Sequence, residues 1–169
     1  MPELSPVDLV LTDPPYEIDL PTVHRKKYNG LKEDYTPIEN DRKGFVLEWF
    51  TEVQRVSKDY VIFGGNNFIE FIPNRYGWIV WDKRCNEMAD RILGSPFELA
   101  ITNKISTYKI YRVQHGGKIN ADSIWGNNDA RFHPTQKPVS LFARILADNP
   151  SASILDPFLG SGTTAIAAT

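Results

Sequence analysis

The chain has 169 residues, which is about the length of one domain and excludes a large multidomain assembly. Its 19 Lys and Arg nearly balance its 21 Asp and Glu, for a net charge of −2, and 41% of its residues are hydrophobic. This balance excludes a disordered tail and a generally polybasic nucleic-acid binder, so a contact with DNA or RNA must come from a local patch. The single cysteine, Cys85, cannot form an internal disulfide.

Two further exclusions concern membranes and export. No run approaches the roughly 20 apolar residues that a membrane span needs. The first six residues, Met-Pro-Glu-Leu-Ser-Pro, lack the charged and then apolar layout of a secretion signal. We therefore expect a cytoplasmic protein with no membrane partner.

Apolar, β-branched runs alternate with segments of helical period, which predicts a single α/β domain over 1–169 with a mostly parallel open sheet. The expected strands are 7–12, 60–63, 77–81, 97–103, 105–113 and 154–155. The expected helices are 42–57, 66–72, 138–147 and a last one that begins near Thr163. Two stretches fit this alternation poorly, 17–41 and 104–130, and we interpret them as loop or recognition insertions.

The tetrapeptide Asp13-Pro14-Pro15-Tyr16 directly follows the first predicted strand. Twin prolines hold the backbone extended, so the carboxylate and the phenol project from the carboxyl end of the strand, where open α/β sheets bind ligands. Asp13 and the Pro14 carbonyl can then accept the two hydrogens of an amino group, while Tyr16 can stack on a planar ring. A strand-terminating turn capped by Asp13 is the alternative, and the tetrapeptide alone does not separate the two.

A second turn, from Asp156 to Thr164, joins the last predicted strand to a helix. Gly160 and Gly162 permit positive φ angles and let a ligand approach the backbone closely, although a glycine turn is often only a tight connection. Without a Gly-Lys-Ser/Thr ending, a phosphate-binding P-loop is disfavoured. A third motif, His133-Pro-Thr-Gln-Lys-Pro138, precedes an amphipathic helix, and by itself it is compatible with a simple proline-rich helix entry.

In this order the three motifs resemble the S-adenosyl-L-methionine-dependent DNA amino-methyltransferases of the β group, the N6-adenine/N4-cytosine family in which the catalytic motif precedes the cofactor loop. The resemblance covers nearly the whole chain and includes the strand at Trp78 to Lys83. It implies a Rossmann-like methyltransferase fold, with an antiparallel edge, and S-adenosyl-L-methionine as cofactor. The residues it places at the catalytic centre are Asp13, Pro14, Pro15 and Tyr16. The residues it places at the cofactor are Asp156, Phe158, Gly160, Ser161, Gly162, Thr163, Thr135, Lys137 and Pro138.

The implied reaction is methyl transfer to N6 of an adenine flipped out of double-stranded DNA in a bacterial or phage-infected cell, a setting typical of restriction-modification. An exocyclic amine is a poor nucleophile, and acceptance of its hydrogens by Asp13 and the Pro14 carbonyl favours a pyramidal nitrogen that faces the methyl group. Tyr16 would hold the flipped base by stacking. Aspartate at the first motif position favours adenine over the N4-cytosine alternative, and methylation of RNA or a protein amide is a remoter one.

Basic side chains in the two insertions are candidates for phosphate contacts, because Tyr108 and Tyr111 interleave with some of them. A solvated loop and a solvated edge strand are the competing interpretations. The candidates are Arg25, Lys26, Lys27, Lys109, Arg112 and Lys118. The three histidines are too scattered to predict a metal site.

The sequence departs from the family pattern after the glycine turn, because it stops at Thr169. The family continues with a strand whose terminal acid binds the ribose hydroxyls. We therefore expect two strands to be missing at the C-terminus and the strand at 154–155 to form an edge that favours association, as a homodimer or with a complementing chain. Two hypotheses follow: an enzyme whose cofactor site is weak or completed by a second subunit, or a catalytically impaired fragment that acts as a nucleic-acid-binding module.

Overall fold

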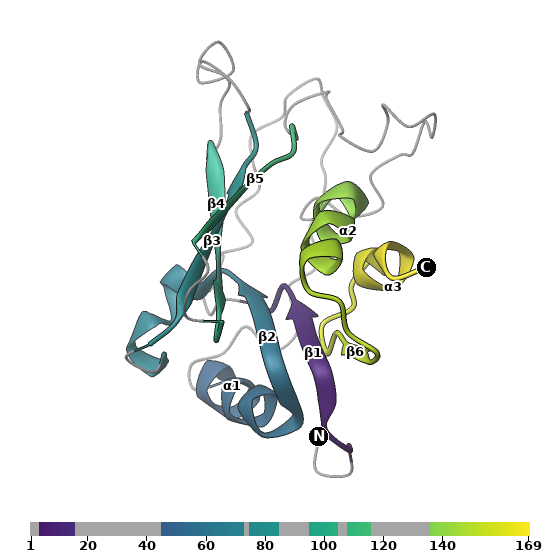
Figure 1. Ribbon diagram of the computed structural model, residues 1–169. Helices are drawn as coiled ribbons and strands as arrows, with labels where there is room; N and C mark the ends of the chain where they lie inside the picture. Colours follow the sequence, from purple (N-terminus) through teal and green to yellow (C-terminus); the bar gives the residue numbers. More distant parts are fainter. Residues whose placement is uncertain (1–3, 16–44, 73–74, 85–94, 105–107, 116–135) are drawn as a thin grey trace, which may run out of the picture.

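The computed structural model describes residues 4–15, 45–72, 75–84, 95–104, 108–115 and 136–169 (Figure 1). The helices and strands in these ranges follow one another as β1 (Val7–Thr12), α1 (Phe45–Val56), β2 (Ser57–Phe63), the 3-10 turns η1 (Gly65–Asn67) and η2 (Ile69–Phe71), β3 (Gly77–Asp82), β4 (Phe97–Thr102), β5 (Lys109–Arg112), α2 (Val139–Asp148), β6 (Ile154–Leu155) and α3 (Thr163–Ala167).

One mixed sheet carries the described strands in the order β5-β3-β4-β2-β1-β6. The pairs β1–β2, β1–β6 and β3–β5 are parallel, which confirms the expected α/β fold. The antiparallel strand β4 lies inside the sheet and not at its edge, contrary to the expectation. Both of its sides are used, because it pairs with β3 from Phe97 to Thr102 and with β2 from Ala100 to Thr102.

Helices cover the two faces of the sheet (Figure 1). On one face, α1 buries the helically spaced residues Val46, Trp49, Phe50, Val53 and Val56, which pack with Val10 and Ile62 of the strands. On the other face, Leu141, Phe142 and Ile145 of α2 pack with Leu9, Leu11 and Phe63. Successive residues of β1 therefore serve opposite layers, as strand geometry requires, and each fully buried apolar side chain contributes about 1.5–3 kcal/mol.

Two predicted elements differ from those observed. The stretch 66–72 forms η1 and η2 in place of one helix, because Phe68 between them has φ −136° and ψ 32°, outside the helical region. The chain passes directly from α1 into β2, which starts at Ser57, three residues before the expected strand. The predicted strand 154–155 and the predicted strand 7–12 have the observed bounds.

The two predicted insertions have different outcomes. The stretch 17–41 lies outside the described residues. Within 104–130, Lys109–Arg112 forms β5, so part of this stretch belongs to the sheet. Each helix in the described ranges is too short or too polar to cross a lipid bilayer.

Candidate active site

The carboxyl ends of β1 and β6 lie side by side, because the two strands are parallel neighbours with Leu9 opposite Ile154 and Val10 opposite Leu155. The chain leaves β1 toward residues 13–15 and leaves β6 toward the turn at 156–162. The helix α1 follows β1 on one face of the sheet, and α3 follows β6 beside α2 on the other (Figure 1). This is the switch point at which open α/β sheets bind ligands.

Asp156 joins the glycine turn to β1. Its Oδ1 accepts a 2.5 Å hydrogen bond from Thr12 Oγ1 and a 3.0 Å bond from the backbone N–H of Phe158. Its Oδ2 accepts a 2.5 Å bond from Thr164 Oγ1 in α3. Thr12 and Thr164 are both buried, so these bonds hold the two segments together without competition from water. The contact of Asp156 with a cofactor stays a prediction.

The turn itself has the predicted glycine geometry. Gly160 has φ 51° and Gly162 has φ 81°, so both occupy the left-handed region that favours glycine. A Cβ on Gly162 would meet no atom within 4 Å, and one on Gly160 would meet only the Phe158 carbonyl oxygen at 3.7 Å. The backbone of the turn therefore borders open space, where a ligand can approach it.

Phe158, which precedes the two glycines, packs into an aromatic cluster. Its ring stands edge-to-face to Phe45 at 6.0 Å and to Trp49 at 5.7 Å between centroids, and both partners belong to α1. Such edge-to-face pairs contribute about 0.5–1.5 kcal/mol beyond area burial. In the structure Phe158 thus anchors the turn to α1, and its predicted contact with the cofactor is not tested.

Lys137 forms a second bridge between the two segments. Its backbone carbonyl accepts a 3.2 Å hydrogen bond from Thr163 Oγ1, and Ser161 Oγ lies 3.2 Å from the same hydroxyl. Its side chain is only 8% exposed and forms an ion pair with Asp13. The next residue, Pro138, is buried, and its carbonyl accepts the N–H of Leu141 at 3.2 Å, so the entry to α2 is fixed.

The ammonium group of Lys137 has a second carboxylate partner that the motifs do not include. Lys137 Nζ lies 3.1 Å from Glu98 Oε2, and Glu98 in turn pairs with Lys83. We call these four side chains, Asp13, Lys137, Glu98 and Lys83, the charge chain. They come from the end of β1, the entry to α2, the start of β4 and the end of β3, and their charges alternate in sign.

The surroundings of the two central members of the charge chain, Glu98 and Lys137, favour their charged forms. Burial raises the pKa of Glu98, but the charge of Lys137 and the hydrogen bond and charge of Lys83 outweigh it, and the pKa of Glu98 lies below its ordinary value. Burial lowers the pKa of Lys137, whereas Asp13 and Glu98 raise it, and the balance leaves the pKa of Lys137 above its ordinary value. Lys137 Nζ also lies 5.5 Å from the Phe63 ring centroid, and Lys83 Nζ lies 4.9 Å from that of Trp81.

The sequence interpretation missed the acceptor and donors that support the site, Glu98, Thr12 and Thr164. The signal for Glu98 is the alternation within β4, which puts it on the same face as Ala100 and Thr102, both buried. An acid on the same face as buried residues favours a partner cation, because a charge withdrawn from water without a partner is unfavourable. That signal predicts a partner but does not identify it.

Several predicted site residues lie outside the described ranges: Tyr16, Thr135, Arg25, Lys26, Lys27 and Lys118. Pro14 is buried and Pro15 partly buried beside Asp13. On β5, Lys109 Nζ pairs with Asp148 at 2.9 Å and Arg112 Nε lies 3.5 Å from Asp82, so both cations contribute to the sheet edge. Their contact with nucleic acid stays a prediction. No group of three or more metal-ligand side chains occurs in the described parts of the chain.

The layered α/β architecture, with polar segments and a glycine turn at the switch point, defines a Rossmann-like fold whose candidate ligand site lies at the carboxyl edge of the sheet. A family model described as DNA methylase, of the N6/N4 type, matches residues 7–169. The chain belongs to this DNA methylase family. The resemblance drawn from the three motifs is thereby confirmed at the level of the family.

Two curated relatives are type II methyltransferases. M.HpaI of Haemophilus parainfluenzae is 29% identical over 95% of this chain and 60% of its own length. M.BglII of Bacillus subtilis is 26% identical over 94% of this chain and 56% of its own length. The chain thus spans somewhat more than half the length of these relatives.

A solved structure supports the fold. The crystal structure of the M1.HpyAVI-SAM complex superposes with a TM-score of 0.51 at 20% identity, over 97% of this chain and 78% of that one. This likeness confirms the Rossmann-like methyltransferase fold expected from the sequence. That protein was crystallised as a complex with SAM, S-adenosylmethionine.

Proposed function

We propose that the site between β1 and β6 transfers a methyl group from S-adenosyl-L-methionine to N6 of adenine in double-stranded DNA. One observation carries the proposal: residues 13–15 and the glycine turn meet at neighbouring strand ends and are tied together by Thr12–Asp156 and by Asp13–Lys137–Thr163. Membership in the DNA methylase family and the SAM complex of a protein with the same fold support the reaction and the cofactor.

The glycine turn fits the proposed cofactor. Its backbone at Gly160 to Gly162 borders open space at the carboxyl edge of the sheet, and the hydroxyls of Ser161 and Thr163 lie beside it. When bound, S-adenosyl-L-methionine supplies an electrophilic methyl group. Lys137, Pro138 and Thr163 form the buried floor between this turn and Asp13, so the chain itself fixes the spacing of the two segments.

Asp13 and the Pro14 carbonyl are the proposed acceptors for the two hydrogens of the target amine. Because Pro15 has no N–H and fixes its own φ angle, the strand cannot continue as an ordinary ladder through this segment. The two acceptors draw the amine hydrogens to one side, and the nitrogen lone pair then faces the turn. Positioning and electrostatic preorganisation of this kind supply most of the rate in transfers without covalent enzyme intermediates.

The choice of adenine rests on the aspartate at the first position of the catalytic motif. An amine inside a duplex is not accessible, so the base must be flipped out at a cost of a few kcal/mol. Tyr16 is the proposed stacking partner for that base. Lys109 and Arg112 of β5 are proposed to contact DNA phosphates. If they do, the affinity for DNA should fall steeply as the salt concentration rises.

Calorimetry with S-adenosyl-L-methionine and transfer of labelled methyl groups test the proposal on the 169-residue chain. We expect micromolar binding and, by mass spectrometry of the digested nucleosides, N6-methyladenine in unmethylated duplex DNA. N4-methylcytosine would overturn the choice of base, and label in RNA or protein would overturn the substrate. DNA binding without cofactor binding up to millimolar concentration would identify a nucleic-acid-binding module.

A matched pair of variants tests the acceptor role. Asp13→Ala should lower the rate of methyl transfer by about 100-fold or more while the Kd for the cofactor stays nearly unchanged. Asp59→Ala is the control, because Asp59 is also paired with a lysine, Lys104 at 3.0 Å, but at the opposite edge of the sheet. An Asp13→Ala protein with full activity would refute the assignment.

A further inference from the structure

We propose that Glu98 and Lys137 are positioning residues for Asp13: the ammonium of Lys137, clamped between two carboxylates, fixes the direction from which Asp13 meets the target amine. The inference rests on the proposed function, because it assumes that Asp13 contacts the substrate. It assigns a role to Glu98, which belongs to none of the three sequence motifs. It also gives Lys137 the role of positioning Asp13, in place of the cofactor contact that the family resemblance implies.

The backbone of Lys137 cannot shift easily. Thr163 Oγ1 donates to its carbonyl at 3.2 Å, and buried Pro138 begins the hydrogen bonding of α2 immediately afterwards. The Cα of Lys137 is therefore tied to the glycine turn on one side and to α2 on the other. From this fixed backbone the side chain extends to the end of β1, where it pairs with Asp13.

The side chain of Lys137 is also fixed at its far end. With 8% exposure it has little access to water, and its ammonium pairs with Asp13 and Glu98 and lies 5.5 Å from the centroid of the Phe63 ring. Rotation of the ammonium away from either carboxylate would leave a buried charge without compensation, which is strongly unfavourable. The position of the Asp13 carboxylate is thus set by the position of Lys137 Nζ.

Glu98 determines how strongly Lys137 neutralises Asp13. A lysine paired with Asp13 alone would cancel the negative charge that the amine hydrogens are to meet. Because Glu98 shares the same ammonium, and Lys83 balances Glu98, the charge chain is neutral in sum while Asp13 keeps its acceptor character. Two carboxylates and two cations in alternation satisfy each other in the way that buried ionic groups require.

The competing role for Lys137 is a direct contact with the cofactor, as the family resemblance implies. The two roles separate in kinetics. Loss of a cofactor contact raises the Kd for S-adenosyl-L-methionine, whereas loss of a positioning contact lowers the rate of transfer at saturating cofactor. Glu98 is the better site for this test, because it is one residue farther from the glycine turn along the charge chain.

Glu98→Gln preserves the shape of the side chain and removes its charge. In single-turnover experiments with saturating cofactor and duplex DNA, we expect the rate to fall by about 10- to 100-fold, with the cofactor Kd within about 2-fold of the unsubstituted chain. Glu52→Gln is the matched control, since Glu52 pairs with Arg55 at 2.9 Å on the outer side of α1. If Glu98→Gln does not fold, Glu98→Asp replaces it, because it keeps the charge but retracts it by one methylene.

Two kinetic results overturn the proposal. If Glu98→Gln raises the Kd for the cofactor but leaves the rate at saturating cofactor unchanged, Glu98 and Lys137 serve the cofactor site. An unchanged rate with an unchanged Kd would show that Asp13 needs no support from Glu98. If the unsubstituted chain binds cofactor but methylates nothing, the proposed function fails. A measurement without substrate then tests whether Glu98 holds the ammonium of Lys137.

That measurement is the titration of Lys137 by NMR of its side-chain ε-carbon, in the absence of cofactor and DNA. The charged groups that face the ammonium are Asp13 and Glu98, and Lys83 faces Glu98. In Glu98→Gln the pKa of Lys137 should fall, because burial persists while one of its two carboxylates is lost. In Glu52→Gln it should stay unchanged. If the pKa of Lys137 is the same in the unsubstituted chain and in Glu98→Gln, Glu98 does not hold the ammonium and the proposal is overturned.

Discussion

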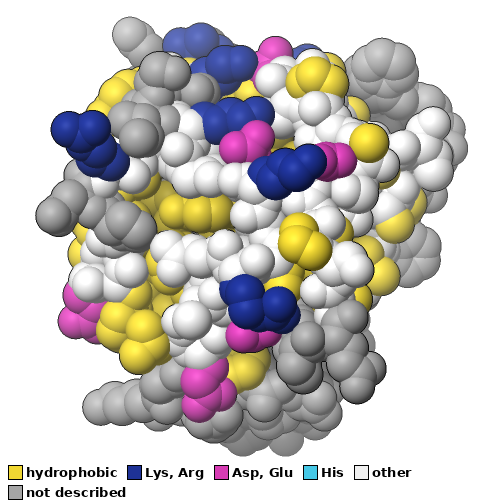
Figure 2. All heavy atoms as spheres, turned by 60° about the horizontal axis from the view of Figure 1, so that its bottom comes forward, with side chains coloured by type: hydrophobic (Ala, Val, Ile, Leu, Met, Phe, Trp, Pro, Cys, Tyr) yellow, Lys and Arg dark blue, Asp and Glu magenta, His cyan; other side chains and the backbone are white. Residues whose placement is uncertain are grey.

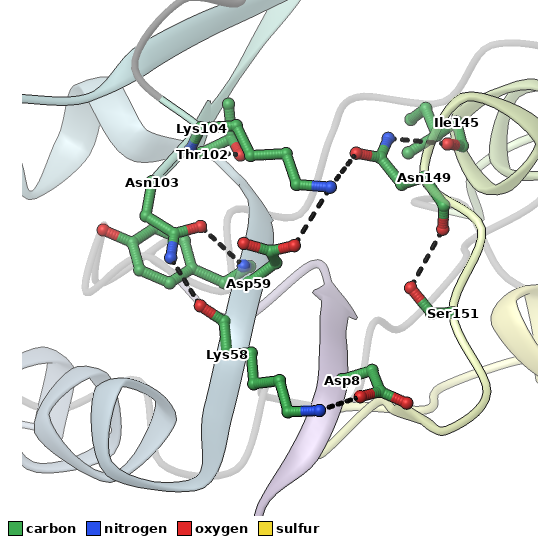
Figure 3. Close-up of polar contacts among 10 residues, drawn as sticks. Asp8, Lys58, Asp59, Thr102, Asn103, Lys104, Ile145, Asn149 and Ser151 are labelled. Carbon is green, nitrogen blue, oxygen red and sulfur yellow. Dashed lines mark hydrogen bonds and ion pairs between the residues drawn. The ribbon is translucent and has the colours of Figure 1, made fainter.

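The same strands carry ion pairs at both edges of the sheet, but the two edges differ in how far their lysines are withdrawn from water, whereas their carboxylates are similarly exposed, at 22% and 30% against 27% and 35%. At the carboxyl edge the lysine side chains of the charge chain are 8% and 17% exposed. At the amino edge Lys58 pairs with Asp8 at 2.5 Å and Lys104 with Asp59 at 3.0 Å, and these lysines are 72% and 38% exposed (Figure 3). Figure 2, which brings this lower end of the molecule forward, shows several basic side chains directly beside acidic ones on the surface.

The difference shows that the contribution of a lysine–carboxylate pair to stability and rigidity depends on its exposure and not on its residue types. An exposed pair exchanges contacts with water for a contact with the partner charge, and its net contribution is close to zero. In the charge chain the buried ammonium of Lys137 is held in place, because it cannot leave its two carboxylates without remaining unpaired away from water. The carboxyl edge therefore has the rigidity that a reacting group needs, whereas the amino edge has the adaptable polarity of a surface.

The largest expected effect comes from removing the central cation. Lys137→Met should lower the free energy of unfolding by about 3 kcal/mol, because it leaves Asp13 and Glu98 near each other with one cation fewer. Urea unfolding followed by circular dichroism measures it. Lys104→Met, the same substitution at the amino edge, should cost about 0.5 kcal/mol or less. Equal losses in the two variants would break the distinction between the edges.

The second-largest effect is expected at the hydrogen bond between Thr164 and Asp156, which involves no lysine or arginine. Thr164→Val removes the hydroxyl that donates 2.5 Å to Asp156 Oδ2 and keeps the branched shape, so it should cost about 2 kcal/mol at this 3% exposed position. Thr51→Val is the control, because Thr51 donates at 2.8 Å to the Leu47 carbonyl on the exposed side of α1. A stable Thr164→Val protein would show that Asp156 does not depend on this bond.

The sequence predicts the frame of the site well, for identifiable reasons. The strands at 7–12 and 154–155 are apolar runs bounded by Pro and by Asp-Pro, and such punctuation marks strand ends clearly. Two strands that each end in a motif are expected to meet at one edge of a parallel sheet, and the Thr12–Asp156 bond confirms that the two segments are neighbours.

The charge chain could not be predicted in the same way. Glu98 reaches Lys137 only because antiparallel β4 lies between β2 and β3, and the order of strands within a sheet is not encoded in local periodicity. The sequence also predicts one helix over 66–72, where η1 and η2 form, since the spacing of its apolar residues is the same whether or not the centre of the stretch is helical. There Gly65 packs closely against Ile101, where a Cβ would lie 2.4 Å from Cγ2, so this position has no room for a side chain.

The third prediction uses pH to compare the edges. The pKa of Glu98 is lowered in the folded state, so its stabilisation is fully present above its ordinary value of 4.5 and is lost as the pH falls through the folded value. The stability difference between the unsubstituted chain and Glu98→Gln should therefore shrink below that pH in urea titrations. In Lys137→Met the pKa of Glu98 should be less depressed, because Lys83 alone then opposes the effect of burial. The stabilisation by charged Glu98 should therefore begin to be lost at a higher pH. A difference that is independent of pH would contradict the charged state of Glu98.

The smallest effect is expected at the most exposed pair. In Lys58→Met the urea midpoint should not shift measurably, although the pKa of Asp8 is lowered first of all by its hydrogen bond to Lys58. The reason is that Asp8 Oδ2 keeps two other donors, the Ser153 N–H at 3.1 Å and the Ser153 hydroxyl at 3.0 Å, while the lost ammonium is replaced by water. A clear loss of stability that vanishes in high salt would show that the amino edge also depends on its charges, and the contrast with the carboxyl edge would then be one of degree.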